Sequence, residues 1–135
     1  MWGKLHRGIA VTLDDGRIVE PSALVGEPRP GRRVVVTGDT RPCEATAEAA
    51  RDADLLVHEA TFADEEAERA KDTGHSTARE AAEVARAAGV RRLALTHFSA
   101  RYSRDASELE REAKAVFRDV IIAKDGLEVD VPFRA

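Results

Sequence analysis

Four short polar clusters in this sequence contain carboxylate or imidazole side chains, the groups that bind metal ions and move protons. Three clusters directly follow apolar runs and the fourth precedes a helical pattern; they are Gly38-Asp39-Thr40, His58-Glu59-Ala60-Thr61-Phe62, Thr96-His97-Phe98-Ser99 and Gly74-His75-Ser76-Thr77. In α/β proteins the functional sites lie at the carboxyl ends of strands. Carboxylates and imidazoles brought together there are the ligands that zinc needs. The sequence therefore predicts a metal site at one edge of a sheet.

Each cluster taken alone has a structural interpretation as well. Asp39 before Thr40 suits an Asx-turn. His58 lies inside an apolar strand, so we interpret it as a core or supporting histidine, and Glu59 could be a solvated strand end. His97 is open between a structural and a functional role. The conjunction of the clusters favours the functional interpretation.

The elements that must position these clusters alternate between strands and helices. The apolar, partly β-branched runs 33–37, 54–59 and 93–96 predict strands, the first of them buried. Helices are predicted over 44–53, 63–71, 77–88 and from 107 onward. The spacings Thr77 to Glu80 and Ser107 to Glu110 each predict a capping box, and Gly89 is placed to end a helix.

Both ends of the chain show a hairpin pattern. Residues 8–19 alternate around Asp14-Asp15-Gly16, and the stretch 120–131 alternates around Asp125-Gly126. The proline-rich stretch 21–31 is predicted to be a loop. Strands alternating with helices indicate an α/β layer architecture, and the hairpins favour a mixed sheet with flanking helices. We expect residues 1–135 to form a single unit.

Composition excludes several classes of protein. The chain has 135 residues, 43% hydrophobic and 34% charged, which is enough for one compact core. A net charge of −4 argues against a domain that coats nucleic acid through a broad positive field. We find neither a membrane span nor a signal peptide, so a cytoplasmic location is expected.

Taken together, the four clusters resemble the later motifs of the ribonuclease Z family, in the metallo-β-lactamase superfamily. They occur in the family's order, and the similarity extends to Trp2-Gly3-Lys4-Leu5, to Val11–Gly16 and to Leu95–Tyr102. The resemblance implies the C-terminal half of a metallo-β-lactamase-type αββα sandwich. It also implies a zinc-dependent endoribonuclease that removes the 3′ trailer from precursor tRNA.

The resemblance assigns roles residue by residue. Asp39 matches the carboxylate that bridges two zinc ions, and His97 matches a histidine ligand of one of them. His75 matches a histidine that acts near the scissile phosphate, and Glu59 matches the glutamate that orients it. We expect substrate contacts from Arg101, whose alternative is a surface salt bridge, and from Ser76 and Thr77, at a helix start whose free N–H groups would favour an anion.

Part of the family's site has no counterpart here. The sequence contains no His-x-His, whereas in the family most zinc ligands and the general base come from a His-x-His-x-Asp-His motif. We therefore expect a fragment or a subunit whose partner supplies the rest, a complementary N-terminal half or a second subunit, with a homodimer in the complete enzyme. The alternatives are another superfamily hydrolase or phosphodiesterase, and a catalytically incomplete scaffold that pairs with another chain.

Overall fold

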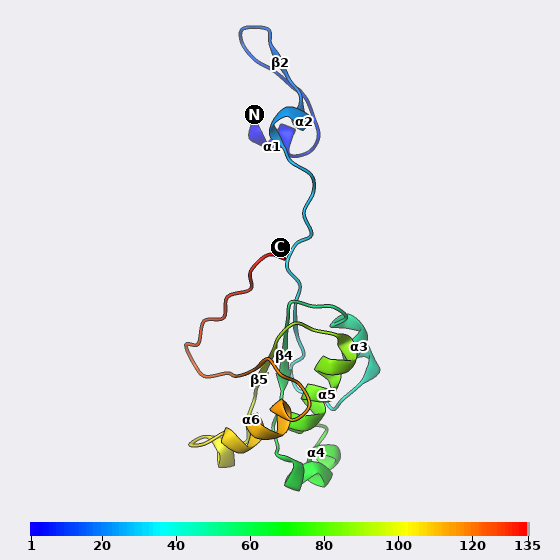
Figure 1. The fold of residues 1–135 in the computed structure, drawn as a ribbon, viewed down its shortest axis with the longest axis vertical. Helices are drawn as coiled ribbons and strands as arrows, with labels where there is room; N and C mark the ends of the chain where they lie inside the picture. Colours follow the sequence, from blue (N-terminus) through cyan, green and yellow to red (C-terminus); the bar gives the residue numbers. More distant parts are fainter. Residues whose placement is uncertain (135) are drawn as a thin grey trace. The chain divides into compact units, whose positions relative to one another are not determined.

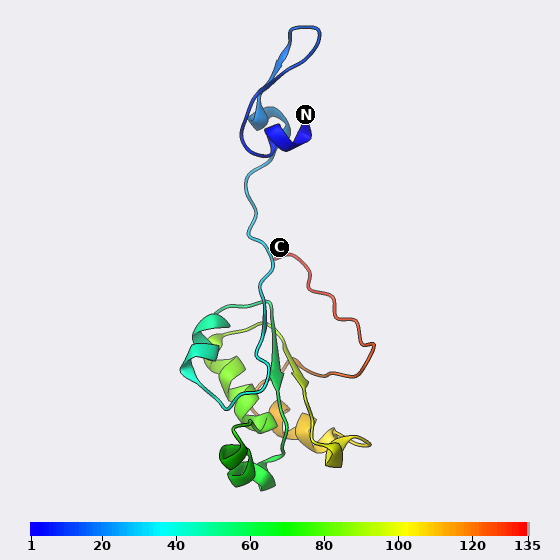
Figure 2. The same cartoon turned by 180° about the vertical axis from the view of Figure 1, so that it is seen from behind.

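The chain is divided into two compact units in the computed structural model, which describes residues 1–134. Contacts gather within residues 1–31 and, separately, from residue 32 onward. Figures 1 and 2 show the ribbon from two sides. No helix in the described part of the chain is long and apolar enough to cross a membrane.

The first unit is a small hairpin between short helices. Helix α1 (Trp2–Leu5) comes first, strands β1 (Val11–Thr12) and β2 (Ile18–Val19) pair antiparallel, and helix α2 (Pro21–Leu24) follows. The predicted Asp-Gly turn is confirmed: the Leu13 N–H donates to the Arg17 carbonyl across it, and Gly16 has φ +82°. The stretch predicted to be a loop begins with α2 instead, because Pro21 sits at a helix N-terminus where a missing N–H costs nothing.

The second unit is a four-stranded parallel sheet in the order β3-β4-β5-β6. Its strands are β3 (Val34–Val36), β4 (Leu55–Glu59), β5 (Leu93–Thr96) and β6 (Val120–Ile122). The connections contain α3 (Glu44–Ala49), the 3₁₀ turn η1 (Asp64–Glu66), α4 (Ala67–Thr73), α5 (Ala78–Ala88), the 3₁₀ turn η2 (Ala100–Tyr102) and α6 (Ser107–Lys114). These helices lie in the crossover connections that parallel neighbours require. All four strands run in the same direction, so their carboxyl ends lie at one edge of the sheet.

One face of this sheet carries the core. Leu56, Leu93 and Leu95 belong to one buried cluster with alanines of α5 and α6, whose small side chains let the helices approach the sheet closely. Figure 1 shows α3 and α5 along one side of β4. The predicted capping box at the start of α5 is confirmed, since Thr77 Oγ1 accepts from the Glu80 N–H and the Glu80 carboxylate accepts from the Thr77 N–H. Gly89 ends the helix in the left-handed conformation, as predicted.

The opposite face of the sheet is open along β3, although Leu55 and Ala94 on that face are buried. Val34 and Val36 are 49% and 67% exposed, and Val57 and Ile121 on the same face are half-buried. The prediction that 33–37 is a buried strand is therefore wrong. A β-branched run indicates a strand, but β3 is an edge strand whose Val35 alone packs against the core.

Two other predictions from local sequence patterns are wrong, because the residues make other contacts in the folded chain. Residues 120–131 do not form a hairpin: β6 pairs parallel with β5 after the α6 crossover, and residues 123–134 form no strand. The tail is held instead by ion pairing of Arg134 with Asp54 and by the Arg32 side chain, which donates to the Val131 carbonyl. Ser107 does not cap α6, because the Asp105 side chain accepts from the Ser107 N–H.

Candidate functional site

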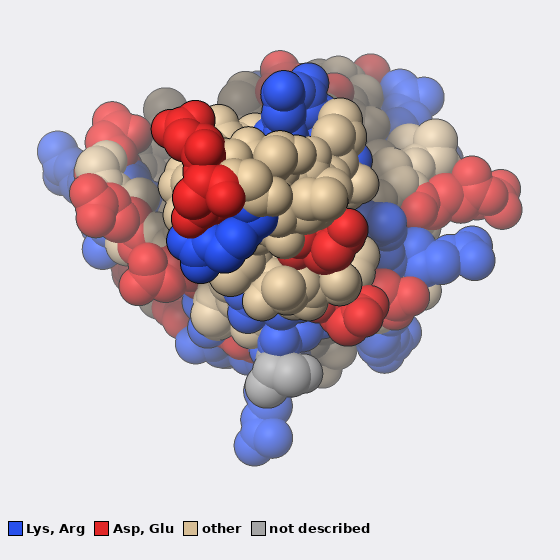
Figure 3. Space-filling model, turned by 90° about the horizontal axis from the view of Figure 1, so that it is seen from above, with Lys and Arg blue, Asp and Glu red and all other residues tan. Residues whose placement is uncertain are grey.

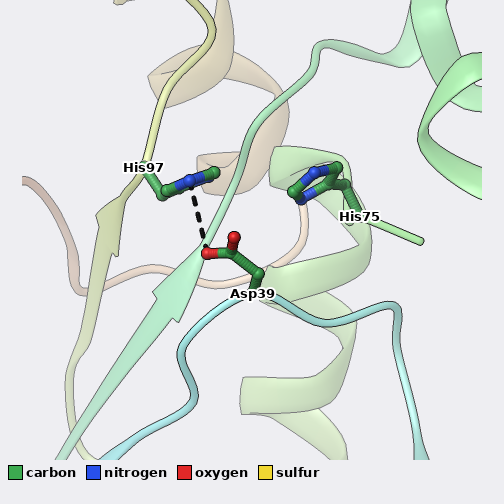
Figure 4. A group of neighbouring side chains, drawn as sticks. All are labelled: Asp39, His75 and His97. Carbon is green, nitrogen blue, oxygen red and sulfur yellow. Dashed lines mark ion pairs between the residues drawn. The ribbon is translucent and has the colours of Figure 1, made fainter. Parts of the chain in front are cut away.

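The clusters that follow β3 and β5 meet His75 at the carboxyl edge of the sheet, as Figure 4 shows. Asp39 Oδ1 lies 3.3 Å from His97 Nε2. The rings of His75 and His97 are nearly parallel, with centroids 5.4 Å apart. One potential ligand atom from each of Asp39, His75 and His97 lies within 4.8 Å of the other two. Residues separated by 58 positions in sequence (39 to 97) therefore converge on one small volume.

The backbone turns sharply where two of these side chains leave the sheet. Gly38, just before Asp39, has φ +66°, and His97, just after β5, has φ +57°. The left-handed region is uncommon for a residue with a Cβ and costs roughly 1–2 kcal/mol. His97 is held there by its surroundings, and such backbone strain is found preferentially at functional sites.

Backbone hydrogen bonds lock the loops of the site to one another. The Ala60 N–H donates to the Thr96 carbonyl, and the Ser99 N–H donates to the Thr61 carbonyl. Phe62 forms a parallel bridge with Thr77. The Tyr102 hydroxyl accepts from the Ala63 N–H at 3.1 Å. The segments after β4 and β5 and the segment before α5 thus form one connected layer beneath Asp39, His75 and His97.

Glu59 lies at the centre of this layer. Its carboxylate is 1% exposed and accepts five hydrogen bonds: Oε1 from the Thr40 N–H and His75 Nδ1, and Oε2 from the Thr61 N–H, Thr61 Oγ1 and the Ser76 N–H. Burial alone would raise the pKa of Glu59, but the backbone hydrogen bonds from Ser76 and Thr40, with those from His75 and Thr61, hold the pKa below its ordinary value. Glu59 is therefore an ionised anchor for three loops.

Thr61 is a site residue to which the sequence analysis gave no role. Its hydroxyl oxygen lies 2.9 Å from Glu59 Oε2, 2.9 Å from His97 Nδ1 and 3.2 Å from His75 Nδ1. The available signal was its place two residues after Glu59 in the same polar cluster. Alternation would put the two side chains on the same side of an extended segment.

The predicted substrate contacts are placed differently from expectation. Ser76 and Thr77 are buried: Ser76 Oγ donates to the Thr40 carbonyl at 2.7 Å, and Thr77 caps α5. The helix N-terminus does not offer the free N–H groups that we expected, because the Thr77 N–H donates to Glu80 and the Ala78 N–H donates to the Phe62 carbonyl. The Arg101 side chain forms an ion pair with Glu66, which is the structural alternative named for it.

His58 is the core histidine that we predicted. It is fully buried, its Nδ1 lies 2.7 Å from the Glu59 carbonyl oxygen, and its Nε2 has no hydrogen-bond partner among the described residues. Burial lowers the pKa of His58, against the hydrogen bond to the Glu59 carbonyl, which raises it. A neutral imidazole therefore sits in the strand beneath Glu59.

The side chains at this edge fit a metal ion. Metal-binding histidines almost always use one ring nitrogen for the metal and the other for a carboxylate, carbonyl or water. Here Nδ1 of His75 faces Glu59 and Nδ1 of His97 faces Thr61, which leaves Nε2 of each ring available to a metal. The Nε2 atom of His97 lies beside Asp39 (Figure 4). One carboxylate with two imidazoles is a donor set typical of open zinc sites.

Comparison with known proteins agrees with this fold. Residues 8–98 match the family described as Beta-lactamase superfamily domain. The chain belongs to this superfamily. Its sequence is 65% identical over 131 residues to ribonuclease Z of Gemmatimonas aurantiaca, which is 97% of this chain and 42% of that protein. It is 58% identical over 134 residues to ribonuclease Z of Myxococcus xanthus, 98% of this chain and 44% of that protein.

Solved structures give the same result. The metallo-beta-lactamase fold protein YhfI from Bacillus subtilis aligns with a TM-score of 0.65 and 31% identity over 82% of this chain and 41% of its own. The short form of human tRNase Z aligns with a TM-score of 0.59 and 31% identity over 86% of this chain and 37% of its own. The predicted α/β class, the superfamily fold and the resemblance to ribonuclease Z are confirmed, for a chain that spans about two fifths of those relatives.

Proposed function

We propose that this chain supplies part of the active site of a zinc-dependent endoribonuclease that removes the 3′ trailer from precursor tRNA. The observation that carries the proposal is the convergence of Asp39, His75 and His97 over the buried Glu59. The similarity to ribonuclease Z and to human tRNase Z supports a tRNA substrate, and a cytoplasmic place of action is part of the proposal. The test is cleavage of precursor tRNA by this chain once the absent ligands are supplied.

In this proposal each residue of the site has a separate role. Asp39 and His97 would hold zinc, which when bound would supply an activated water and neutralise charge on the phosphate. His75 is the proton donor, or the cation that stabilises the transition state, beside the scissile phosphate. Its Nδ1–H donates to Glu59 Oε1 at 2.8 Å, which aims Nε2 away from the core and toward the site. Glu59 acts through His75 and is a positioning residue.

The surface of the chain favours local rather than broad recognition of RNA. Basic and acidic side chains are interspersed on the face seen in Figure 3, and the net charge is −4. A protein that binds RNA only through a diffuse positive field would need a concentration of Lys and Arg. Most phosphate contacts are therefore expected to come from the complementary part of the enzyme.

The first prediction tests the assignment of the ligands. Of the three groups that fit a metal ion, the proposal makes only Asp39 and His97 ligands. Two is fewer than the three protein ligands of a typical open zinc site, so we expect well under one zinc per chain after gel filtration. We expect His97→Ala to lower the residual zinc binding, since it removes a ligand. His75→Ala is expected to leave zinc binding nearly unchanged, because His75 is proposed to move a proton. Metal analysis and zinc titration measure both.

Because one ring nitrogen of His75 belongs to the close group of potential ligand atoms, His75→Ala separates a ligand role of this histidine from a proton-transfer role. Loss of zinc binding in His75→Ala as large as in His97→Ala would make His75 a metal ligand and remove its proposed role. Two tightly held zinc ions in the unaltered chain would show that the site is misplaced. His6→Ala is the matched control, since His6 is exposed and lies in residues 1–31.

The second prediction concerns the partner. We propose that a complementary N-terminal half, or a second subunit, covers the sheet face formed by Val34, Val36, Val57 and Ile121, and that the complete enzyme is a homodimer. Contiguous exposed apolar patches larger than a few hundred Å² usually mark interfaces. Without the partner, the chain is expected to self-associate through this face, with a concentration-dependent mass in sedimentation velocity.

Val36→Lys is expected to weaken that association about tenfold or more, a change of roughly 1.4 kcal/mol. The matched control, Thr12→Lys, adds the same charge to an exposed strand residue of the first unit and should change nothing. A chain that stays monomeric at every concentration would contradict the prediction.

A further inference from the structure

The Thr61 hydroxyl has contacts with more groups of the site than any simple packing role requires. The side chain is only 7% exposed, and its oxygen touches Glu59 Oε2, His97 Nδ1 and His75 Nδ1. A hydroxyl has one proton to donate and two lone pairs that can accept. The three contacts therefore use its full hydrogen-bonding capacity. Once the group that receives the hydroxyl proton is known, the hydroxyl oxygen must be the acceptor in the other two contacts.

The chemistry of Glu59 decides where that proton goes. An ionised carboxylate only accepts, and a hydrogen bond to an ionised group is roughly twice as strong as one between neutral groups. Thr61 Oγ1 therefore donates to Glu59 Oε2 at 2.9 Å. Its lone pairs then face His97 Nδ1, also at 2.9 Å. This contact is favourable only if His97 Nδ1 carries a hydrogen.

Asp39 pulls the His97 imidazole toward the opposite tautomer. Its Oδ1 lies 3.3 Å from His97 Nε2 and would accept a proton placed there. However, the Asp39 side chain is 60% exposed, so water weakens its attraction. A hydrogen on Nε2 would instead leave the Nδ1 lone pair against a lone pair of the largely buried Thr61 hydroxyl at 2.9 Å, which is repulsive. The contact with Thr61 therefore outweighs the contact with Asp39 and decides the tautomer of His97.

We infer that Thr61 is a positioning residue that fixes neutral His97 as the Nδ1–H tautomer, with the Nε2 lone pair presented to the metal position. The inference rests on the proposed function for its purpose, since Nε2 is the atom by which His97 would bind zinc. His75 does not depend on Thr61 in the same way. Its Nδ1–H is held by Glu59 Oε1 at 2.8 Å, and Thr61 lies farther, at 3.2 Å.

The test is long-range ¹H–¹⁵N NMR of the imidazoles in the metal-free chain, at a pH where they are neutral. The chain has four histidines, so the spectrum is simple. In the unaltered protein His97 should show Nδ1–H. In Thr61→Val it should switch to Nε2–H, because only Asp39 then accepts a hydrogen bond from the ring. Thr61→Ser should restore Nδ1–H, and His75 should remain Nδ1–H in all three proteins.

An Nε2–H tautomer at His97 in the unaltered chain overturns the inference, even if Thr61→Val fails to fold. Retention of Nδ1–H in a folded Thr61→Val overturns it as well. A second measurement is the affinity for Co²⁺ or Zn²⁺, which should fall about 10–100-fold in Thr61→Val and stay within a few-fold in Thr61→Ser. Equal affinities in the two variants would also count against the inference. If none of the proteins binds metal, the proposed zinc role fails, while the spectra still decide the tautomer.

Discussion

Mixed with a second chain that carries the His-x-His-x-Asp-His motif and completes the fold, this chain is expected to cut precursor tRNA endonucleolytically at the 3′ end. Alone it should not cut, even with added zinc or manganese. The reason is that Asp39, His75 and His97 provide only part of what the proposed reaction needs: water must be activated by a fully held metal and aligned with the phosphate. A gel assay on a 3′-extended precursor measures the product.

Substitutions in the reconstituted enzyme separate the roles. Asp39→Ala or His97→Ala should abolish cleavage together with metal binding. His75→Ala should keep metal content nearly unchanged and lower the cleavage rate roughly 10²–10⁴-fold, the usual range for a positioned proton-transfer group. His6→Ala should cut like the unaltered enzyme. Robust cleavage by this chain alone, insensitive to Asp39→Ala, would exclude the proposed mechanism.

The parts of the fold that the sequence predicted well are those whose signals are local. The capping box from Thr77 to Glu80 depends on groups three residues apart, and the left-handed Gly89 depends on its own missing side chain. The interior strands β4 and β5 are short apolar runs buried on both faces or nearly so. Such features need no knowledge of distant residues.

The wrong predictions concern features that depend on residues distant in the sequence. Val34 and Val36 have the same residue type as buried Val84 and Val90, yet the fold leaves them on an uncovered face. The alternation of Leu127, Val129 and Val131 suits a strand, but β6 already has β5 as its neighbour through the α6 crossover. Residue type indicates strand or helix. It does not indicate which edge or face finds a partner.

The site shows the same division. The residues Asp39, Glu59, His75 and His97 could be singled out because four clusters with carboxylates or imidazoles occur in one short chain, three of them at strand ends. The structure brings all four residues together. Thr61 could not be singled out, since a threonine is common and its three contacts come from residues up to 36 positions away. Ser76 and Thr77 were expected to face a substrate, but their hydroxyls are used to build the loop that carries His75.

Glu59→Gln is expected to be among the most destabilising single-atom changes available in this chain. The new amide can be oriented in two ways, with its NH₂ group at the position of Oε1 or of Oε2. In both, the NH₂ group meets hydrogen-bond donors that face a carboxylate oxygen in the unaltered chain. With the remaining oxygen toward Thr61 and Ser76, the Thr40 N–H and His75 Nδ1–H lose their acceptor. Each buried donor left without a partner costs about 1–3 kcal/mol. We therefore expect a loss of roughly 2–6 kcal/mol at pH 7, measured by urea unfolding with far-UV circular dichroism.

The pH dependence of that loss follows from the lowered pKa of Glu59. A carboxyl whose pKa is lower in the folded than in the unfolded state stabilises the fold fully above its unfolded pKa, and the contribution disappears as the pH falls through the folded pKa. The difference in the free energy of unfolding between the unaltered chain and Glu59→Gln should therefore be constant near neutrality and shrink below about pH 4.5, the ordinary value for Glu. The control Glu83→Gln changes an exposed carboxylate on α5 and should alter stability by less than about 0.5 kcal/mol at any pH. A Glu59→Gln chain as stable as this control at pH 7 would mean that the five hydrogen bonds to Glu59 do not hold the three loops together.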